Sequence, residues 1–257
     1  MKFQKLLFIG LALAMLPQFS SFAQTNAPAT ADAMMSATTN SPNAAIIPVS
    51  RTGAALKRQT LVLKRAHDNP GDYDIEFIGD SITQFWETFG SNVWSQYYSH
   101  RKVINMGVSG DLTQHVLWRF DHGQLDGIKA KVAVVMIGTN NTKTNAFTEA
   151  QILEGVTAIV QQVRTRQPDT KILLFAIFPR GQTFNGQRAE LLQVNEALAR
   201  LDDGSHIFYY DIGPQMIEND GSISRAMMPD YLHPRQMGYE IWAAAMEPKI
   251  KQLLGEN

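Results

Sequence analysis

Two short stretches of the chain are almost entirely apolar, and they constrain the fold more than any other feature. Val132–Ile137 reads Val-Ala-Val-Val-Met-Ile, and Lys171–Phe178 continues after its lysine with seven apolar residues. Strands that are apolar at every position, rather than at every second one, are buried on both faces, which is typical of a parallel sheet covered by helices. We expect three further strands of this sheet at Ile75–Gly79, Lys102–Asn105 and His206–Asp211.

The segments between these strands have the spacing of apolar residues that is typical of helices. Between Thr148 and Arg166, apolar residues recur every three or four positions, and Thr148 with Gln151 forms a candidate capping box. Strands that alternate with helices form βαβ units, so the chain is predicted to be an α/β protein. The sequence has no internal repeat or second domain boundary, and 257 residues can form one α/β domain. Further helices are expected at Arg51–His67, Gln187–Arg200 and Gln236–Leu254.

The first residues of the chain have the pattern of an export signal. Two lysines precede Leu6–Leu16, a run of apolar residues and glycine that is too short for the ~20 residues of a membrane-spanning helix. Ser21 and Ala23 are small residues at the two positions that a signal peptidase reads. We expect residues 1–23 to be a cleaved signal peptide and the mature protein to be secreted or periplasmic. The alternative is an uncleaved anchor.

The next segment, residues 24–50, contains a single charged residue, Asp32, and is otherwise rich in Ala, Thr, Ser, Asn and Pro. A segment of this composition buries too little apolar surface to offset the entropy lost on ordering. We therefore expect residues 24–50 to be a flexible spacer and residues 51–257 to be the folded domain.

Composition excludes several classes of chemistry and partner. The chain contains no cysteine, which excludes disulfides, thiolate nucleophiles, Cys-ligated zinc and iron–sulfur clusters. The net charge of −1 argues against a broad nucleic-acid footprint and against a polybasic membrane patch. No other apolar run approaches the length of a membrane span, so stable membrane insertion is not expected.

Small polar residues follow the predicted strands, at the point where each strand ends. Ser81 follows the first strand, Gly107 the second, Asn140 the third and Arg180 the fourth, while His233 precedes the last helix. The carboxyl ends of parallel strands meet at one edge of the sheet, and that edge holds the ligands of open α/β folds. We expect these residues to lie close together there.

Ser81, His233 and Asp230 have the residue types of a nucleophilic triad. A serine hydroxyl is a weak nucleophile until a base removes its proton, and a neutral imidazole can do this while a carboxylate fixes its tautomer. Asp230 stands three residues before His233 and can fold back onto it in a turn. Taken singly, each residue is more common as a turn or surface residue, so the prediction depends on their joint occurrence.

An acyl-transfer site also needs hydrogen-bond donors for the oxyanion. We predict three: the Ser81 N–H, the Gly107 N–H and the side-chain amide of Asn140. Two substrate contacts are also considered. Trp86 either packs in the core or lines the acyl or alcohol pocket. Arg180 either meets a polar group of the substrate or forms a surface salt bridge.

Four separate blocks of the sequence resemble the SGNH (GDSL-type) hydrolases. They are Phe77–Thr83, Asn105–Gly107, Gly138–Asn140 and the pair Asp230 and His233. The runs Gly110–Arg119 and Pro179-Arg180-Gly181 are similar to the platelet-activating-factor acetylhydrolase catalytic-subunit branch of that family.

The resemblance implies a flavodoxin-like three-layer α/β/α sandwich with a five-stranded parallel sheet. It also implies an esterase without metal or cofactor. In this family pattern, Ser81 is the nucleophile, His233 the base and Asp230 its partner, and Ser81, Gly107 and Asn140 form the oxyanion hole. The branch that the chain resembles forms dimers, so a homodimer is an expectation by analogy.

The resulting hypothesis is a secreted serine esterase that hydrolyses short-chain esters, with acetyl favoured because no long apolar lid segment is visible. Its substrate would be a small-molecule or carbohydrate ester. An acyltransferase to a carbohydrate hydroxyl and a non-catalytic carbohydrate-binding protein of the same fold remain alternatives. A flavodoxin-like nucleotide binder is the weakest alternative, because no phosphate-binding glycine loop follows the first strand.

Overall fold

The core of the protein is a five-stranded parallel sheet with strand order β2-β1-β3-β4-β5. A computed structural model describes residues 42–144 and 146–256. All four strand pairings are parallel, as the apolar runs predict, and Phe77 at the centre of the sheet is in register with Asn105 on one side and Val134 on the other. The strands are β1 (Gly71–Gly79), β2 (Val103–Asn105), β3 (Ile128–Met136), β4 (Lys171–Phe175) and β5 (Ile207–Tyr210).

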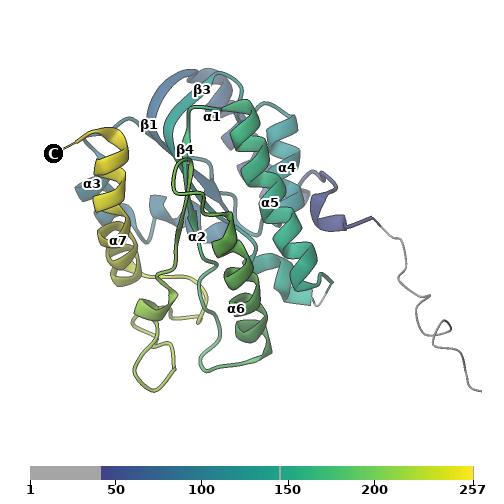
Figure 1. The fold of residues 1–257 in the computed structure, drawn as a ribbon, viewed down its shortest axis with the longest axis vertical. Helices are drawn as coiled ribbons and strands as arrows, with labels where there is room; N and C mark the ends of the chain where they lie inside the picture. Colours follow the sequence, from purple (N-terminus) through teal and green to yellow (C-terminus); the bar gives the residue numbers. More distant parts are fainter. Residues whose placement is uncertain (1–41, 145, 257) are drawn as a thin grey trace, which may run out of the picture. The chain divides into compact units, whose positions relative to one another are not determined.

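Helices cover both faces of this sheet and complete a three-layer sandwich. The helices α3 and α7 lie on one side, and α4, α5 and α6 lie on the other (Figure 1). The helix α1 buries its apolar face in a separate cluster, where Val62 and Ala66 pack with Ile104 and Ile128. The fold class is therefore the predicted one. The helices are α1 (Gly53–Asp68), α2 (Ser81–Gln84), α3 (Ser91–Tyr98), α4 (Thr113–Asp121), α5 (Glu149–Arg166), α6 (Gly186–Leu198) and α7 (Gln236–Leu254).

Most predicted element boundaries differ by a few residues, and the fourth strand shows why. The prediction extended it to Phe178, but β4 ends at Phe175. Beyond that point, the backbone of Ile177 bonds to the side chain of Asn195 in α6 instead of to a neighbouring strand. This side chain accepts a hydrogen bond from the Ile177 N–H at 2.8 Å and donates one to the Ile177 carbonyl at 2.9 Å. The apolar run continues because these residues stay buried, although they no longer belong to the ladder.

The helix ends agree better with the sequence. The predicted bounds of α7 are those observed. At the start of α5, Thr148 accepts a hydrogen bond from the Gln151 N–H, and the Gln151 side chain accepts one from the Thr148 N–H, so the capping box is confirmed.

The end of the predicted spacer is part of the folded unit. Residues 44–46 form a short 3₁₀ helix with Ala45 buried, and the Ala45 carbonyl accepts a hydrogen bond from Thr113 Oγ1 at 2.8 Å. The Asn43 side chain reaches the carbonyl of Gln151 in α5. This differs from the prediction that the spacer extends to residue 50. The physical reason is that hydrogen bonds to α4 and α5 and the burial of Ala45, which composition does not reveal, hold these residues against the domain. The predicted signal peptide and residues 24–41 lie outside the described residues.

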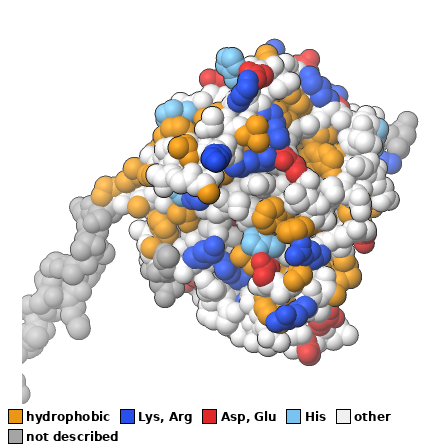
Figure 2. Space-filling view, turned by 180° about the vertical axis from the view of Figure 1, so that it is seen from behind, with side chains coloured by type: hydrophobic (Ala, Val, Ile, Leu, Met, Phe, Trp, Pro, Cys, Tyr) orange, Lys and Arg blue, Asp and Glu red, His pale blue; other side chains and the backbone are white. Residues whose placement is uncertain are grey.

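The surface on the face in Figure 2 mixes side chains of every kind, with hydrophobic groups between basic and acidic ones. Within the part of the chain that the structure describes, none of the helices combines the length and the apolar character that crossing a bilayer requires.

A buried carboxyl group in β1 makes stability depend on pH. Glu76 is fully buried, and burial raises its pKa to about 8, with only Gln167 opposing the shift. The folded state therefore holds a proton that the unfolded chain releases near pH 4.5. This stabilisation is complete below that pH and is lost as the pH rises through 8, by at most about 1.4 kcal/mol per pH unit.

We predict that Glu76→Gln reduces this loss of stability. Between pH 5 and pH 8, the unfolding temperature of the wild type should fall relative to that of the variant, which has no proton to release at this position. Thermal unfolding followed by circular dichroism at several pH values measures the difference. Parallel curves for the two proteins would contradict the prediction.

Candidate functional site

Ser81 lies at the carboxyl end of β1, where the strand passes directly into α2. Asp80 caps this helix, because its side chain accepts a hydrogen bond from the Ile82 N–H at 3.0 Å. Burial raises the pKa of the Asp80 carboxyl to about 7. Ser81 is the first residue of α2 and is 4% exposed. Its N–H has no partner within the described residues, as expected for a first-turn N–H.

The Ser81 hydroxyl contacts His233, which comes from a loop 152 positions later in the chain. Ser81 Oγ lies 2.9 Å from His233 Nε2. On the other side of the ring, His233 Nδ1 lies 2.6 Å from Asp230 Oδ2. The ring of Phe85 packs edge-on against the imidazole, with centroids 5.1 Å apart. The structure therefore places the three predicted triad residues in one chain of contacts.

A tight turn holds Asp230 and His233 in this arrangement. Asp230 Oδ1 accepts hydrogen bonds from the N–H groups of Leu232 at 3.2 Å and His233 at 2.8 Å. Tyr231 between them has a φ of +57°, which is uncommon for a residue with a side chain and is typical of functional turns. Partial burial alone would raise the pKa of Asp230, but its hydrogen bonds from His233 lower it below the usual value. Asp230 is therefore suited to remain a carboxylate beside the imidazole.

Asn140 also lies at this edge of the sheet, at the start of the 3₁₀ segment Thr139–Thr144 that follows β3. Its side chain is buried, and Nδ2 donates a hydrogen bond to the Asp111 carbonyl at 2.9 Å. An amide nitrogen carries two hydrogens, so one remains for a ligand.

Gly107 does not fit the role predicted for it. Its N–H already donates a hydrogen bond to the Asn105 side chain at 2.8 Å. A Cβ at Gly107 would lie 2.3 Å from the backbone nitrogen of Gln84, so glycine is needed here for close packing against α2. The prediction of Gly107 as an oxyanion donor is therefore wrong, because its N–H belongs to the internal structure of the loop.

Gly110, three residues further on, has the unpartnered N–H that Gly107 lacks, and the sequence did not single it out. Its N–H has no hydrogen-bond partner within the described part of the chain, and its φ of +78° is one that glycine adopts without strain. It adjoins Asp111, whose carbonyl binds Asn140. The direction of an N–H depends on backbone angles that the sequence does not give. The dipeptide Gly110-Asp111 therefore indicated a turn and nothing more.

Trp86 is a core residue and not a substrate contact. It is fully buried, and its indole packs against Tyr239 and Trp242 of α7, with ring centroids 4.5 Å and 5.2 Å away. The proposed role in lining the acyl or alcohol pocket is therefore corrected. The reason is that Trp86 lies in the turn after α2, and α7 packs against the face of that turn from which its side chain projects.

Arg180 lies beside the triad. Its guanidinium donates to the carbonyl of Thr139 at 3.0 Å and to the Thr139 hydroxyl at 3.3 Å. Partial burial lowers its pKa, while the nearby carboxylates of Asp80 and Asp230 act in the opposite direction. None of the ion pairs within 4.0 Å among the described residues involves Arg180, so the surface salt bridge considered for it is not formed.

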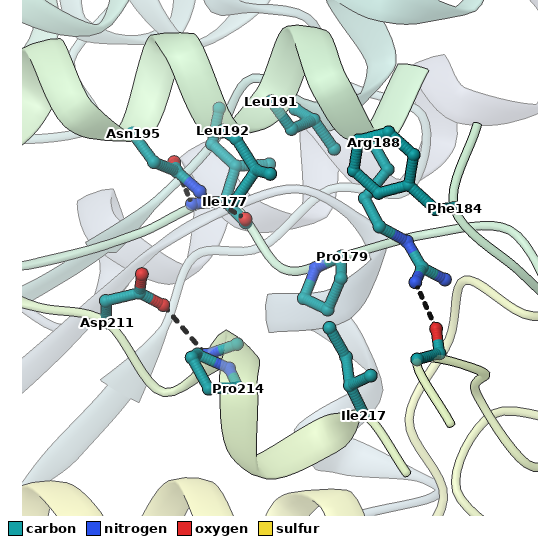
Figure 3. A pocket seen from close by; sticks show the side chains of 12 residues that line it. Ile177, Pro179, Phe184, Arg188, Leu191, Leu192, Asn195, Asp211, Pro214 and Ile217 are labelled. Atoms are coloured by element: carbon teal, nitrogen blue, oxygen red, sulfur yellow. Dashed lines mark hydrogen bonds between the residues drawn. The ribbon is translucent and has the colours of Figure 1, made fainter. Parts of the chain in front are cut away.

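A separate apolar cavity of about 210 Å³ lies between α6 and the 3₁₀ segment Gly213–Met216 (Figure 3). Pro179, Phe184 and Leu192 are among its lining residues, and Arg188 lies at one end. None of the residues predicted for the site lines this cavity. The chain from Pro179 to Gly181 connects it to the triad loop, since the Gly181 N–H donates to the Tyr231 carbonyl at 2.8 Å.

Comparison with known proteins gives consistent results. Residues 77–241 match the model of the GDSL-like Lipase/Acylhydrolase family. The human platelet-activating factor acetylhydrolase IB subunit alpha1 is 37% identical over 185 residues, which cover 72% of this chain and 78% of that protein.

Two solved structures share the fold. A GDSL-like lipase from Bacteroides thetaiotaomicron has a TM-score of 0.60 at 18% identity, covering 76% of this chain and 97% of the other. A carbohydrate acetylesterase family member from Sinorhizobium meliloti has a TM-score of 0.56 at 18% identity, covering 70% and 98%. With the family model spanning all the blocks from the end of β1 to the start of α7, the chain belongs to the GDSL-like lipase/acylhydrolase family.

Proposed function

We propose that this protein is a serine esterase in which Ser81 is the nucleophile, His233 the general base and Asp230 the residue that orients the imidazole. The observation that carries the proposal is the continuous chain of contacts from Ser81 Oγ to His233 Nε2 and from His233 Nδ1 to Asp230 Oδ2, at 2.9 Å and 2.6 Å. Both distances are within the hydrogen-bond reach that nucleophile and base require.

In the proposed mechanism, Ser81 Oγ forms a bond to the ester carbonyl carbon while its proton moves to His233 Nε2. The carbonyl oxygen becomes an oxyanion, held by the N–H groups of Ser81 and Gly110 and by the free amide hydrogen of Asn140. The bond to the alcohol oxygen then breaks, and the alcohol leaves with the proton from His233. Water repeats the sequence on the acyl-enzyme and releases the acid.

We further propose that the substrate carries a short acyl group, with acetyl preferred. The relative that is 37% identical over most of both chains is an acetylhydrolase by name. The proposed substrates include carbohydrate esters as well as small-molecule esters, because a carbohydrate acetylesterase family member has the same fold. The signal-like pattern of residues 1–23 supports action outside the cytoplasm, in the medium or the periplasm.

We predict that kcat/KM falls as the acyl chain of a p-nitrophenyl ester lengthens from acetyl to butyryl to octanoyl. The physical reason is that an apolar cavity of about 210 Å³ beside α6, which has room for a long chain, is lined by none of the triad or oxyanion residues. Initial rates at several substrate concentrations measure the trend. A rise in kcat/KM towards octanoyl would contradict the acetyl preference, while absence of hydrolysis of every ester would contradict the esterase itself.

A further inference from the structure

Three arginines at seven-residue intervals reach the loop that follows β2. Arg65 and Arg58 of α1 donate to the carbonyls of Asn105 at 2.6 Å and of Gly107 at 3.0 Å. Arg51, just before α1, donates to the carbonyl of Gly110 at 3.1 Å. Arg58 and Arg65 are seven positions apart in α1 and therefore lie on one face of that helix, while Arg51 reaches the loop from the residues before it. Together the three guanidinium groups contact successive carbonyls of the loop.

Acidic groups hold this arginine row in place. Glu87 forms ion pairs with Arg58 at 2.8 Å and with Arg65 at 2.6 Å. Although partial burial of Glu87 acts to raise its pKa, its hydrogen bonds to both arginines lower it. Arg51 lies 3.6 Å from the buried carboxylate of Asp111. The row is thus anchored at both ends by carboxylates and is only partly exposed.

The loop itself needs such support, because it contains glycine at positions 107 and 110. Glycine restricts the backbone less than any other residue, so a loop with two glycines can adopt many conformations. Arg51 also packs directly against Gly110, since its Nη2 lies 2.9 Å from the point where a Cβ would stand. With three of its carbonyls bound by arginines, the loop has fewer conformations open to it, and the direction of the Gly110 N–H is restricted with them.

We propose that Arg51, Arg58 and Arg65 are positioning residues for the oxyanion hole, acting through the carbonyls of the loop from Asn105 to Gly110. The inference rests on the proposed esterase function and extends it to α1 and the segment before it, which lie outside the family match at residues 77–241. Oxyanion donors contribute most when they are already oriented, and a displacement of about 1 Å can cost a factor of about 10² in rate.

The test compares Arg51→Gln, Arg58→Gln and Arg51→Lys with wild type, using p-nitrophenyl acetate. The two glutamine variants should lower kcat by about 10-fold and change KM by less than about twofold, because the oxyanion forms only after binding. Arg51→Lys should recover part of kcat, since an ammonium group can still donate to the Gly110 carbonyl. Lys57→Gln is the matched control: Lys57 is an exposed neighbour of Arg58 on α1, and its loss should leave kcat unchanged.

Unfolding temperatures separate positioning from a merely structural role. If kcat of the folded glutamine variants stays within twofold of the Lys57→Gln value, the inference is wrong. It is equally wrong if Arg51→Lys restores the unfolding temperature but none of the lost kcat. Ser81→Ala distinguishes this failure from failure of the esterase proposal, because the latter predicts that wild type is active and Ser81→Ala is not, whatever the arginine variants do.

Discussion

Replacing Ser81 with alanine is expected to lower kcat for p-nitrophenyl acetate by about 10⁴- to 10⁶-fold, the range that loss of a serine nucleophile produces. The reason is that alanine has no oxygen beside His233 Nε2 to attack the ester carbonyl. The same substitution should abolish covalent labelling by an organophosphonate, which reacts with an activated serine. Intact mass measurement before and after incubation with the reagent gives this second result directly.

The Ser81→Ala variant should fold normally, because within the described residues the side chain of the serine makes a hydrogen bond to His233 and to no other group. Ser95→Ala provides a matched control: this exposed serine of α3 lies outside the proposed machinery and should retain wild-type activity and labelling. Retention of substantial activity in a folded Ser81→Ala protein would overturn the nucleophile assignment.

The elements that the sequence predicted best are those set by local pattern. The continuous apolar runs identified β3 and β4 because burial on both faces requires apolar residues at every position. The contact between Asp230 and His233 was also predictable, since three residues in a turn bring a carboxylate back to the ring. The rule that the carboxyl ends of parallel strands share one edge predicted where Ser81 and Asn140 lie. It did not by itself predict the approach of Ser81 to His233, because His233 comes from the loop before α7 and not from a strand end.

The errors concern features that depend on distant parts of the chain or on backbone angles. Trp86 could have faced either the core or the site, and its place was decided by Tyr239 and Trp242, which lie more than 150 positions later. Gly107 and Gly110 look alike as letters in a sequence. They differ in where their N–H groups point, and only the three-dimensional structure contains that information.

Replacing His233 with alanine is the second change for which we expect a loss of about 10⁴-fold or more in kcat. Without the imidazole, the Ser81 hydroxyl keeps its proton and the leaving alcohol receives none, so both halves of the reaction are affected. Organophosphonate labelling of Ser81 should slow as well. Slower labelling would show that the serine itself has lost reactivity. His122→Ala is the matched control, because that histidine stacks on Trp118 and makes no contact with the triad.

A serine and a base that act as one unit should give strongly non-additive losses. The double variant Ser81→Ala with His233→Ala is therefore expected to be no slower than Ser81→Ala alone, because an imidazole has nothing to activate once the hydroxyl is gone. If the double variant instead lost the product of the two single factors, the two residues would contribute independently. The contact of 2.9 Å between them would then be structural, and the catalytic base would have to be sought elsewhere at the edge of the sheet.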